Sequence, residues 1–99
     1  MMLGDKISAE EAERWGMIYK YFDDEVFDAE AKKIASTLAN MPTKALGYIK
    51  KALQWSFKNS LEEQLEHEDK LQQRAAATED YAEGLKAFLE KRPAVFRGK

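Results

Sequence analysis

The side chain with the clearest potential for acid–base chemistry is Glu68. It interrupts an otherwise apolar helical stripe between residues 61 and 75, and a carboxyl group in such a place is a candidate general acid or base. The same placement fits a structural carboxylate that pairs with a lysine, an arginine or a backbone donor. His67 points about 100° around the helix from Glu68, which favours a lone surface histidine.

Several kinds of site are excluded by composition. The chain has no cysteine and one histidine, so it has no disulfides, no Cys or Cys/His zinc site and no cysteine nucleophile. Its five glycines are scattered, so no phosphate-binding loop or glycine-turn oxyanion hole is indicated. We therefore predict no catalytic residue and no metal site, and interpret the chain as a binding or structural element.

The last predicted helix carries the strongest signal for ligand binding. Gly84, Phe88 and Lys91 stand at i, i+4 and i+7, which places them on one helix face. A flat ring beside a cation could hold a purine next to a phosphate. The alternative is that Phe88 belongs to the core and Lys91 is merely solvated. Arg97 and Lys99 could add charge, but we expect this terminal segment to be mobile.

Apolar periodicity predicts an all-α fold of about five helices with at most one short strand, the strand at residues 17–22. Capping boxes at Ser8 and Ser60 and a cap at Thr78 mark three helix starts. The third helix, about 43–58, has two apolar faces, which indicates that it is sandwiched or meets a partner chain. Pro93 is expected to end the last helix after Arg92.

The chain has 99 residues, a net charge of −2 and 44% hydrophobic residues. This size is typical of one small domain. A nucleic-acid binder is disfavoured because phosphate neutralisation supplies most of such affinity. No apolar run approaches the ~20 residues of a membrane span. We expect a cytoplasmic protein that binds neither nucleic acid nor membrane.

Several motifs resemble the crotonase (enoyl-CoA hydratase/isomerase) superfamily. They cover the chain in order: LGDKISAEEA at 3–12, WGMI at 15–18, PTKA at 42–45, TED at 78–80 and EGLKAFLEKRP at 83–93. The last is the most specific. The resemblance implies that residues 1–99 form the C-terminal helical, trimerisation domain of a crotonase-fold enzyme whose N-terminal catalytic ββα core is absent here. We accordingly expect the chain to be a piece of a longer acyl-CoA enzyme.

The resemblance also implies roles for particular residues. Phe88 and Lys91 match the aromatic and lysine that, in hydratases of this family, reach the adenine and phosphate of a coenzyme A bound mainly by a neighbouring subunit. Leu3 and Gly4, with the first helix, match the wall of the acyl pocket. The family's catalytic glutamates have no counterpart in this chain, so the resemblance assigns no catalytic residue to it. No prosthetic group is implied, since CoA is part of the substrate thioester, and the parent is expected to be a trimer or hexamer.

The motifs ERWGMI at 13–18 and YFDDE at 21–25 are most similar to the phenylacetate-degradation branch. The resemblance thus implies the oligomerisation and CoA-gripping domain of an enoyl-CoA hydratase/isomerase of fatty-acid or phenylacetate catabolism, inactive by itself. The alternative is a free-standing helical protein–protein interaction module without catalytic activity.

Overall fold

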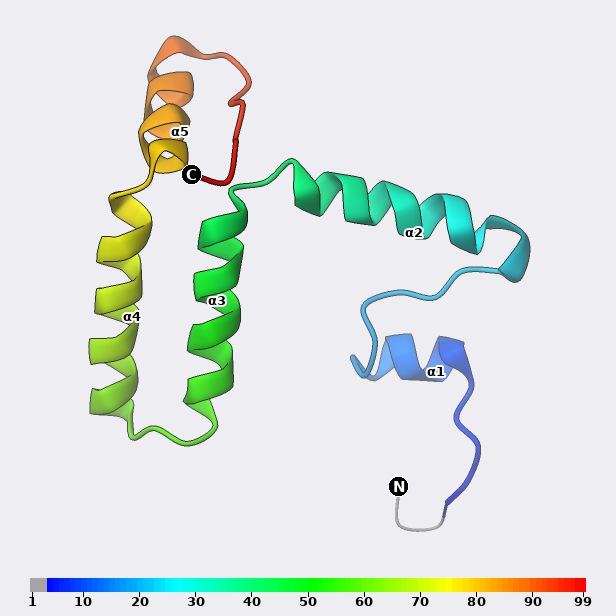
Figure 1. Cartoon of the computed structure of the whole chain (residues 1–99). Coiled ribbons are helices and arrows are strands. Elements are labelled where there is room, and N and C mark those ends of the chain that lie inside the picture. Colours follow the sequence, from blue (N-terminus) through cyan, green and yellow to red (C-terminus); the bar gives the residue numbers. More distant parts are fainter. Residues whose placement is uncertain (1–3) are drawn as a thin grey trace. The chain divides into compact units, whose positions relative to one another are not determined.

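Five helices account for the regular structure of residues 4–99, the part of the chain that the computed structural model describes (Figure 1). They are α1 (Ala9–Arg14), α2 (Asp24–Ala39), α3 (Thr43–Ser56), α4 (Leu61–Ala76) and α5 (Glu79–Glu90). No strand occurs among the described residues: residues 17–19 form bends, and residues 20–22 form an irregular link. The prediction of an all-α fold is confirmed.

The described residues divide into two compact units, 4–35 and 36–99, and α2 runs across the division. In the first unit α1 begins with the predicted capping box. The Glu11 N–H donates to Ser8 Oγ at 3.2 Å, and the Ser8 N–H donates to Glu11 Oε2 at 3.4 Å. After α1 the chain reverses at Gly16, whose φ of +72° is a left-handed value that favours glycine.

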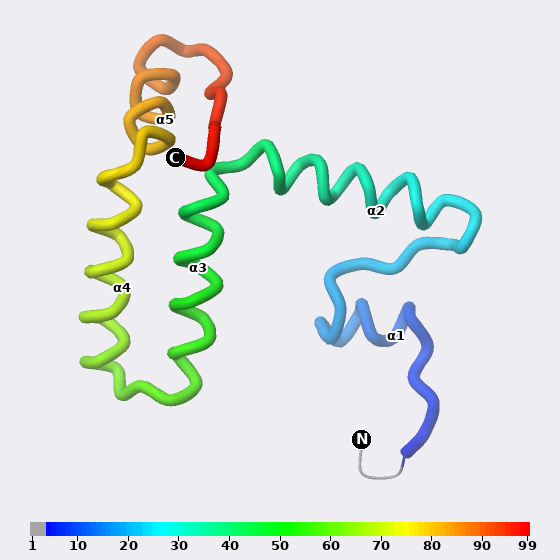
Figure 2. The backbone as a smooth tube through the Cα atoms, viewed as in Figure 1, coloured from blue at the N-terminus to red at the C-terminus, as the bar shows by residue number. Residues whose placement is uncertain are grey.

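The second unit contains an antiparallel helical hairpin of α3 and α4, visible side by side in Figure 2. Ser60 begins α4 with the second predicted capping box, in which its N–H donates to Glu63 Oε2 at 2.8 Å. This contact lowers the pKa of Glu63. The Gln64 amide donates across the hairpin to the Ala52 carbonyl at 3.2 Å.

The two apolar faces of α3 have different surroundings within this unit. Tyr48 and Ala52 are half-buried against α4, where Leu71 supplies one of the few buried apolar side chains, at 6% exposure. Ile49 and Leu53, in the other apolar stripe, are exposed and lie along the open edge of the α3–α4 groove. The two-faced pattern predicted a helix that is sandwiched or meets a partner chain; within the described residues only the Tyr48 and Ala52 stripe is covered, by α4.

Among residues 4–99, no helix is both long enough and apolar enough to cross a bilayer.

Candidate functional site

The site is built on α5, whose first turn is fixed by two side chains. Thr78 caps the helix by accepting from the Tyr81 N–H at 3.1 Å, as predicted. Asp80 is 3% exposed, and its carboxylate accepts from the backbone N–H groups of Arg97 at 2.7 Å and Gly98 at 2.8 Å. The terminal segment that was expected to be mobile is therefore bonded to the start of α5.

One turn further along α5, Glu83 also bonds to the segment that follows the helix, residues 93–99, which we call the returning segment. The Arg92 guanidinium donates from Nη1 and Nη2 to the two Glu83 oxygens at 2.7 and 2.9 Å, and the Val95 N–H donates to Glu83 Oε1 at 2.9 Å. These hydrogen bonds to Arg92 and Val95 lower the pKa of Glu83 to about 2. Arg92 also donates from Nε to Glu90 at 2.6 Å, and both carboxylates raise the pKa of Arg92.

The end of α5 differs from the prediction. The helix ends at Glu90 and not after Arg92, because Lys91 adopts a left-handed conformation with φ 53° and ψ 39°. The Lys91 N–H donates to the Phe88 carbonyl at 3.3 Å, and the Arg92 N–H donates to the Ala87 carbonyl at 3.0 Å. This is the Schellman pattern, in which the left-handed position is usually glycine.

The predicted trio of Gly84, Phe88 and Lys91 is only partly brought together. Gly84 and Phe88 line one groove of about 370 Å³, whereas Lys91 lies just past the helix and outside the lining. Phe88 is 79% exposed, so its ring does not belong to the core of the described residues. The groove lies between α5, the start of α3 and the returning segment, and its other lining residues are Pro42, Ala45, Ala75, Thr78, Asp80, Tyr81, Leu85 and Phe96.

The two adjacent cations after α5 have different environments. Arg92 is bonded to two carboxylates. Lys91 is exposed, and within residues 4–99 no carboxylate oxygen lies within 4.0 Å of its ammonium. Arg92 therefore serves the local structure, and Lys91 remains available to an anionic ligand.

Glu68 and His67 do not form a catalytic pair. Glu68 is neither buried nor paired with a cation: it is exposed and accepts from the Gln64 amide at 2.8 Å. His67 is half-buried, and its ring contacts the Trp55 ring with centroids 4.2 Å apart and a tilt of 52° between the planes. The expectation of a lone surface histidine is thus wrong, because the α3–α4 register brings the Trp55 indole against it.

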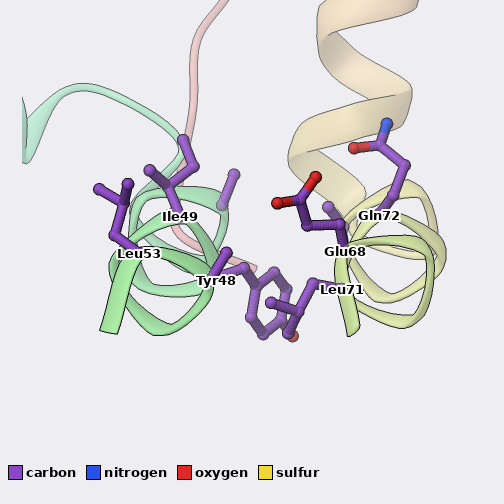
Figure 3. A pocket seen from close by; sticks show the side chains of 9 residues that line it. Tyr48, Ile49, Leu53, Glu68, Leu71 and Gln72 are labelled. Atoms are coloured by element: carbon purple, nitrogen blue, oxygen red, sulfur yellow. The ribbon is translucent and has the colours of Figure 1, made fainter. Parts of the chain in front are cut away.

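Glu68 borders a second groove, of about 320 Å³, between α3 and α4. Figure 3 shows Tyr48 and Leu71 pointing toward one another between the helices, with the Glu68 carboxylate beside them. A single carboxylate on an open apolar groove provides no partner for proton transfer and no oxyanion donor. The geometry therefore supports no catalytic assignment here.

Two other predictions concern metal ligands and the wall of the acyl pocket. No cluster of three or more potential metal ligands occurs among the described residues. Leu3, one of the two residues matched to the acyl-pocket wall, lies outside the described residues. Gly4 has a φ of +72° and is exposed.

Solved structures give the class of fold. The chain superimposes with a TM-score of 0.92 and 35% identity on the crystal structure of an enoyl-CoA hydratase/isomerase from Mycobacterium abscessus, covering 99% of this chain and 38% of that one. An enoyl-CoA hydratase from Polaromonas sp. JS666 gives a TM-score of 0.90 at 30% identity, covering 98% of this chain and 38% of that one. The five helices correspond to the C-terminal portion of crotonase structures.

The family model described as enoyl-CoA hydratase/isomerase matches residues 1–99, and the chain belongs to this family. It is 44% identical over 98 residues to 1,2-epoxyphenylacetyl-CoA isomerase of Escherichia coli K12, covering 99% of this chain and 37% of the relative. It is 34% identical over 99 residues to 2,3-dehydroadipyl-CoA hydratase of the same organism, covering 100% of this chain and 39% of the relative. The chain thus spans less than two fifths of the length of these relatives.

Proposed function

We propose that this chain is the CoA-gripping and subunit-joining part of a cytoplasmic enoyl-CoA hydratase or isomerase of fatty-acid or phenylacetate catabolism. Phe88 stacks on the adenine ring of CoA, and Lys91 pairs with one of its phosphates. One observation carries the proposal: an exposed aromatic ring at the end of α5 stands three residues before a lysine that has no carboxylate partner among residues 4–99. Family membership supplies the ligand class.

The chemistry itself belongs to parts of the parent enzyme outside these residues. Backbone amides there would stabilise the enolate-like oxyanion of the thioester, and carboxylates there would move protons or activate water. An isomerase and a hydratase are both among the relatives, so this chain fits either reaction. The chain alone is expected to have no hydratase activity, and appreciable turnover by the pure chain would refute the proposal.

The open face of α3 supports the second half of the role. Ile49 and Leu53 are exposed, and Phe57, just past the helix, is 89% exposed. Contiguous exposed apolar side chains of this size mark interaction surfaces. Enzymes of the crotonase family are typically trimers or hexamers, and this face is suited to such a contact.

Calorimetric titration of the chain with free CoA tests the grip. Phe88→Ala removes the stacking platform and should weaken binding about tenfold, because stacking of a base on an aromatic side chain contributes ~1–3 kcal/mol. Lys91→Ala should weaken it to a similar extent, since a hydrogen bond to a charged group contributes ~1.5–3 kcal/mol. Leu89→Ala and Lys86→Ala are matched controls, since both side chains are exposed on α5. Leu89→Ala should bind as wild type. Lys86→Ala removes the same charge as Lys91→Ala but no proposed contact, so it should lose much less affinity than Lys91→Ala.

Equal binding by all four variants would overturn the assignment of the grip to Phe88 and Lys91. If the wild-type chain bound no CoA, the claim that this chain forms the grip by itself would be wrong. Family membership would be unaffected by either result.

A further inference from the structure

The segment after α5, residues 93–99, has no regular secondary structure and returns along the helix. Its burial alternates: residues 94, 96 and 98 are half-buried, and residues 95, 97 and 99 are exposed. One side of this segment is thus covered and the other is open. Phe96 is therefore on the inward side, between the points at which the segment is bonded to α5.

Two carboxylates on α5 hold this segment. Asp80 accepts the N–H groups of Arg97 and Gly98, and its own N–H donates to the Lys99 carbonyl at 3.1 Å. Glu83 accepts the N–H of Val95. Asp80 and Glu83 are three residues apart and so share one helix face. Together they bond the returning segment on both sides of Phe96.

This bonding determines one wall of the groove that Phe88 lines. The Phe96 ring lies against Gly84, and a Cβ at residue 84 would stand 3.6 Å from Phe96 Cε1. Phe88 and Phe96 line the same groove. The position of Phe96 thus follows from hydrogen bonds to Asp80, which also lines the groove, and to Glu83, which does not.

We propose that Asp80 and Glu83 are positioning residues for the CoA grip: their carboxylates hold residues 93–99 on α5 so that Phe96 forms the wall facing a ligand stacked on Phe88. This inference rests on the proposed function. Without these bonds a seven-residue terminal segment regains conformational entropy and leaves the helix. The groove then loses one aromatic wall although Phe88 and Lys91 are unchanged.

Asp80→Asn is the main test. The isosteric amide puts an NH₂ donor against one of the two backbone N–H groups that Asp80 now accepts. Hydrogen exchange measured by NMR should become about tenfold or more faster at the Arg97 and Gly98 amides. Affinity for free CoA should fall about fivefold, equivalent to ~1 kcal/mol.

Glu79→Gln is the matched control, since it removes the same charge from the neighbouring residue and the Glu79 carboxylate accepts no hydrogen bond within residues 4–99. CoA is a polyanion, so charge removal alone strengthens its binding. The two effects therefore have opposite signs: Asp80→Asn should weaken binding, and Glu79→Gln should leave it unchanged or strengthen it.

Phe96→Ala separates the wall from its anchors. It should weaken CoA binding about fivefold while the Arg97 and Gly98 amides stay protected from hydrogen exchange. If Asp80→Asn fails to fold, Phe96→Ala alone tests whether Phe96 forms a wall of the binding groove. Full affinity in Phe96→Ala, or in an Asp80→Asn chain whose segment is released, would overturn this inference and leave the proposed function intact. Failure of the wild-type chain to bind CoA would overturn the claim that this chain forms the grip by itself and, with it, this inference.

Discussion

Replacing Lys91 with glycine should make the fold more stable and CoA binding weaker. Lys91 has a φ of 53° and a ψ of 39°, and it is the only residue other than glycine with positive φ among those described. A residue with a Cβ in this conformation is destabilised by ~1–2 kcal/mol relative to its right-handed form, whereas glycine has no such penalty. Glycine also loses more backbone entropy on folding, which reduces the gain.

The net effect expected for Lys91→Gly is a rise of ~0.5–1 kcal/mol in the free energy of unfolding. For a domain of this size, 1 kcal/mol corresponds to a rise in Tm of about 4–8 °C. No ion pair of the described residues is lost with the side chain. Urea unfolding followed by circular dichroism at constant protein concentration measures the change.

Lys91→Ala is the control that isolates the backbone term. It removes the same side chain but keeps a Cβ in the left-handed conformation, so its stability should not exceed that of the wild type. Both variants should lose CoA affinity equally. If Lys91→Gly were no more stable than Lys91→Ala, the strain argument would be refuted. If both variants bound CoA as the wild type does, the ligand role of Lys91 would be refuted instead.

Three further outcomes are expected. Gly84→Ala and Gly47→Ala should each stabilise their helices by ~0.5–1 kcal/mol, since a Cβ meets nothing at 47 and only ordinary contact at 84; urea unfolding measures both, and only Gly84→Ala should reduce CoA affinity because it narrows the groove. Leu71→Ala should lower the free energy of unfolding by ~2–5 kcal/mol, because it leaves a cavity between α3 and α4. A decrease below about 1 kcal/mol in the same assay would show that this contact contributes little to stability. The hydrogen bonds to Arg92 lower the pKa of Glu83 to about 2 from 4.5, so their stabilising effect is fully present above pH 4.5 and is lost as pH falls through 2. Urea unfolding should therefore show that Glu83→Gln is less stable than the wild type by a constant amount above pH 5 and by a decreasing amount below pH 4.5. A difference in stability that did not change with pH would contradict this.

Helix starts were predictable from the sequence because their signals are local. A serine and a glutamate three residues apart define a capping box wherever they occur, and both boxes form, at Ser8 and Ser60. Thr78 caps α5 in the same way. The two-faced pattern of α3 predicted a helix that is sandwiched or meets a partner chain, and one of its faces does pack against α4.

The end of α5 was not predictable from the same signals. Pro93 indicates where a helix must have ended, but the stop two residues earlier depends on a left-handed lysine, a conformation that sequence patterns assign to glycine or asparagine. Asp80 stands in the first turn of α5, where the helix dipole alone is enough to favour an acid. Its bonds to Arg97 and Gly98 join residues 17 and 18 positions apart, and no local rule encodes them.

His67 illustrates the same limit between helices. Its position on α4 relative to Glu68 follows from the helical repeat. Its tilted contact with the Trp55 ring depends on the register of α4 against α3. That register is determined by side-chain packing between the two helices. The Phe88 and Lys91 assignment needed both helical spacing and the family resemblance, and the structure adds that Arg92, not Lys91, is occupied by carboxylates.

The most direct test of the grip is an NMR titration of the ¹⁵N-labelled chain with free CoA, because it reports where the ligand binds. We predict that the largest amide shifts fall at Gly84, Phe88 and Lys91, and that they are abolished in Phe88→Ala. Shifts confined to the groove between α3 and α4, around Tyr48 and Leu71, would contradict the account and assign the ligand to the other groove.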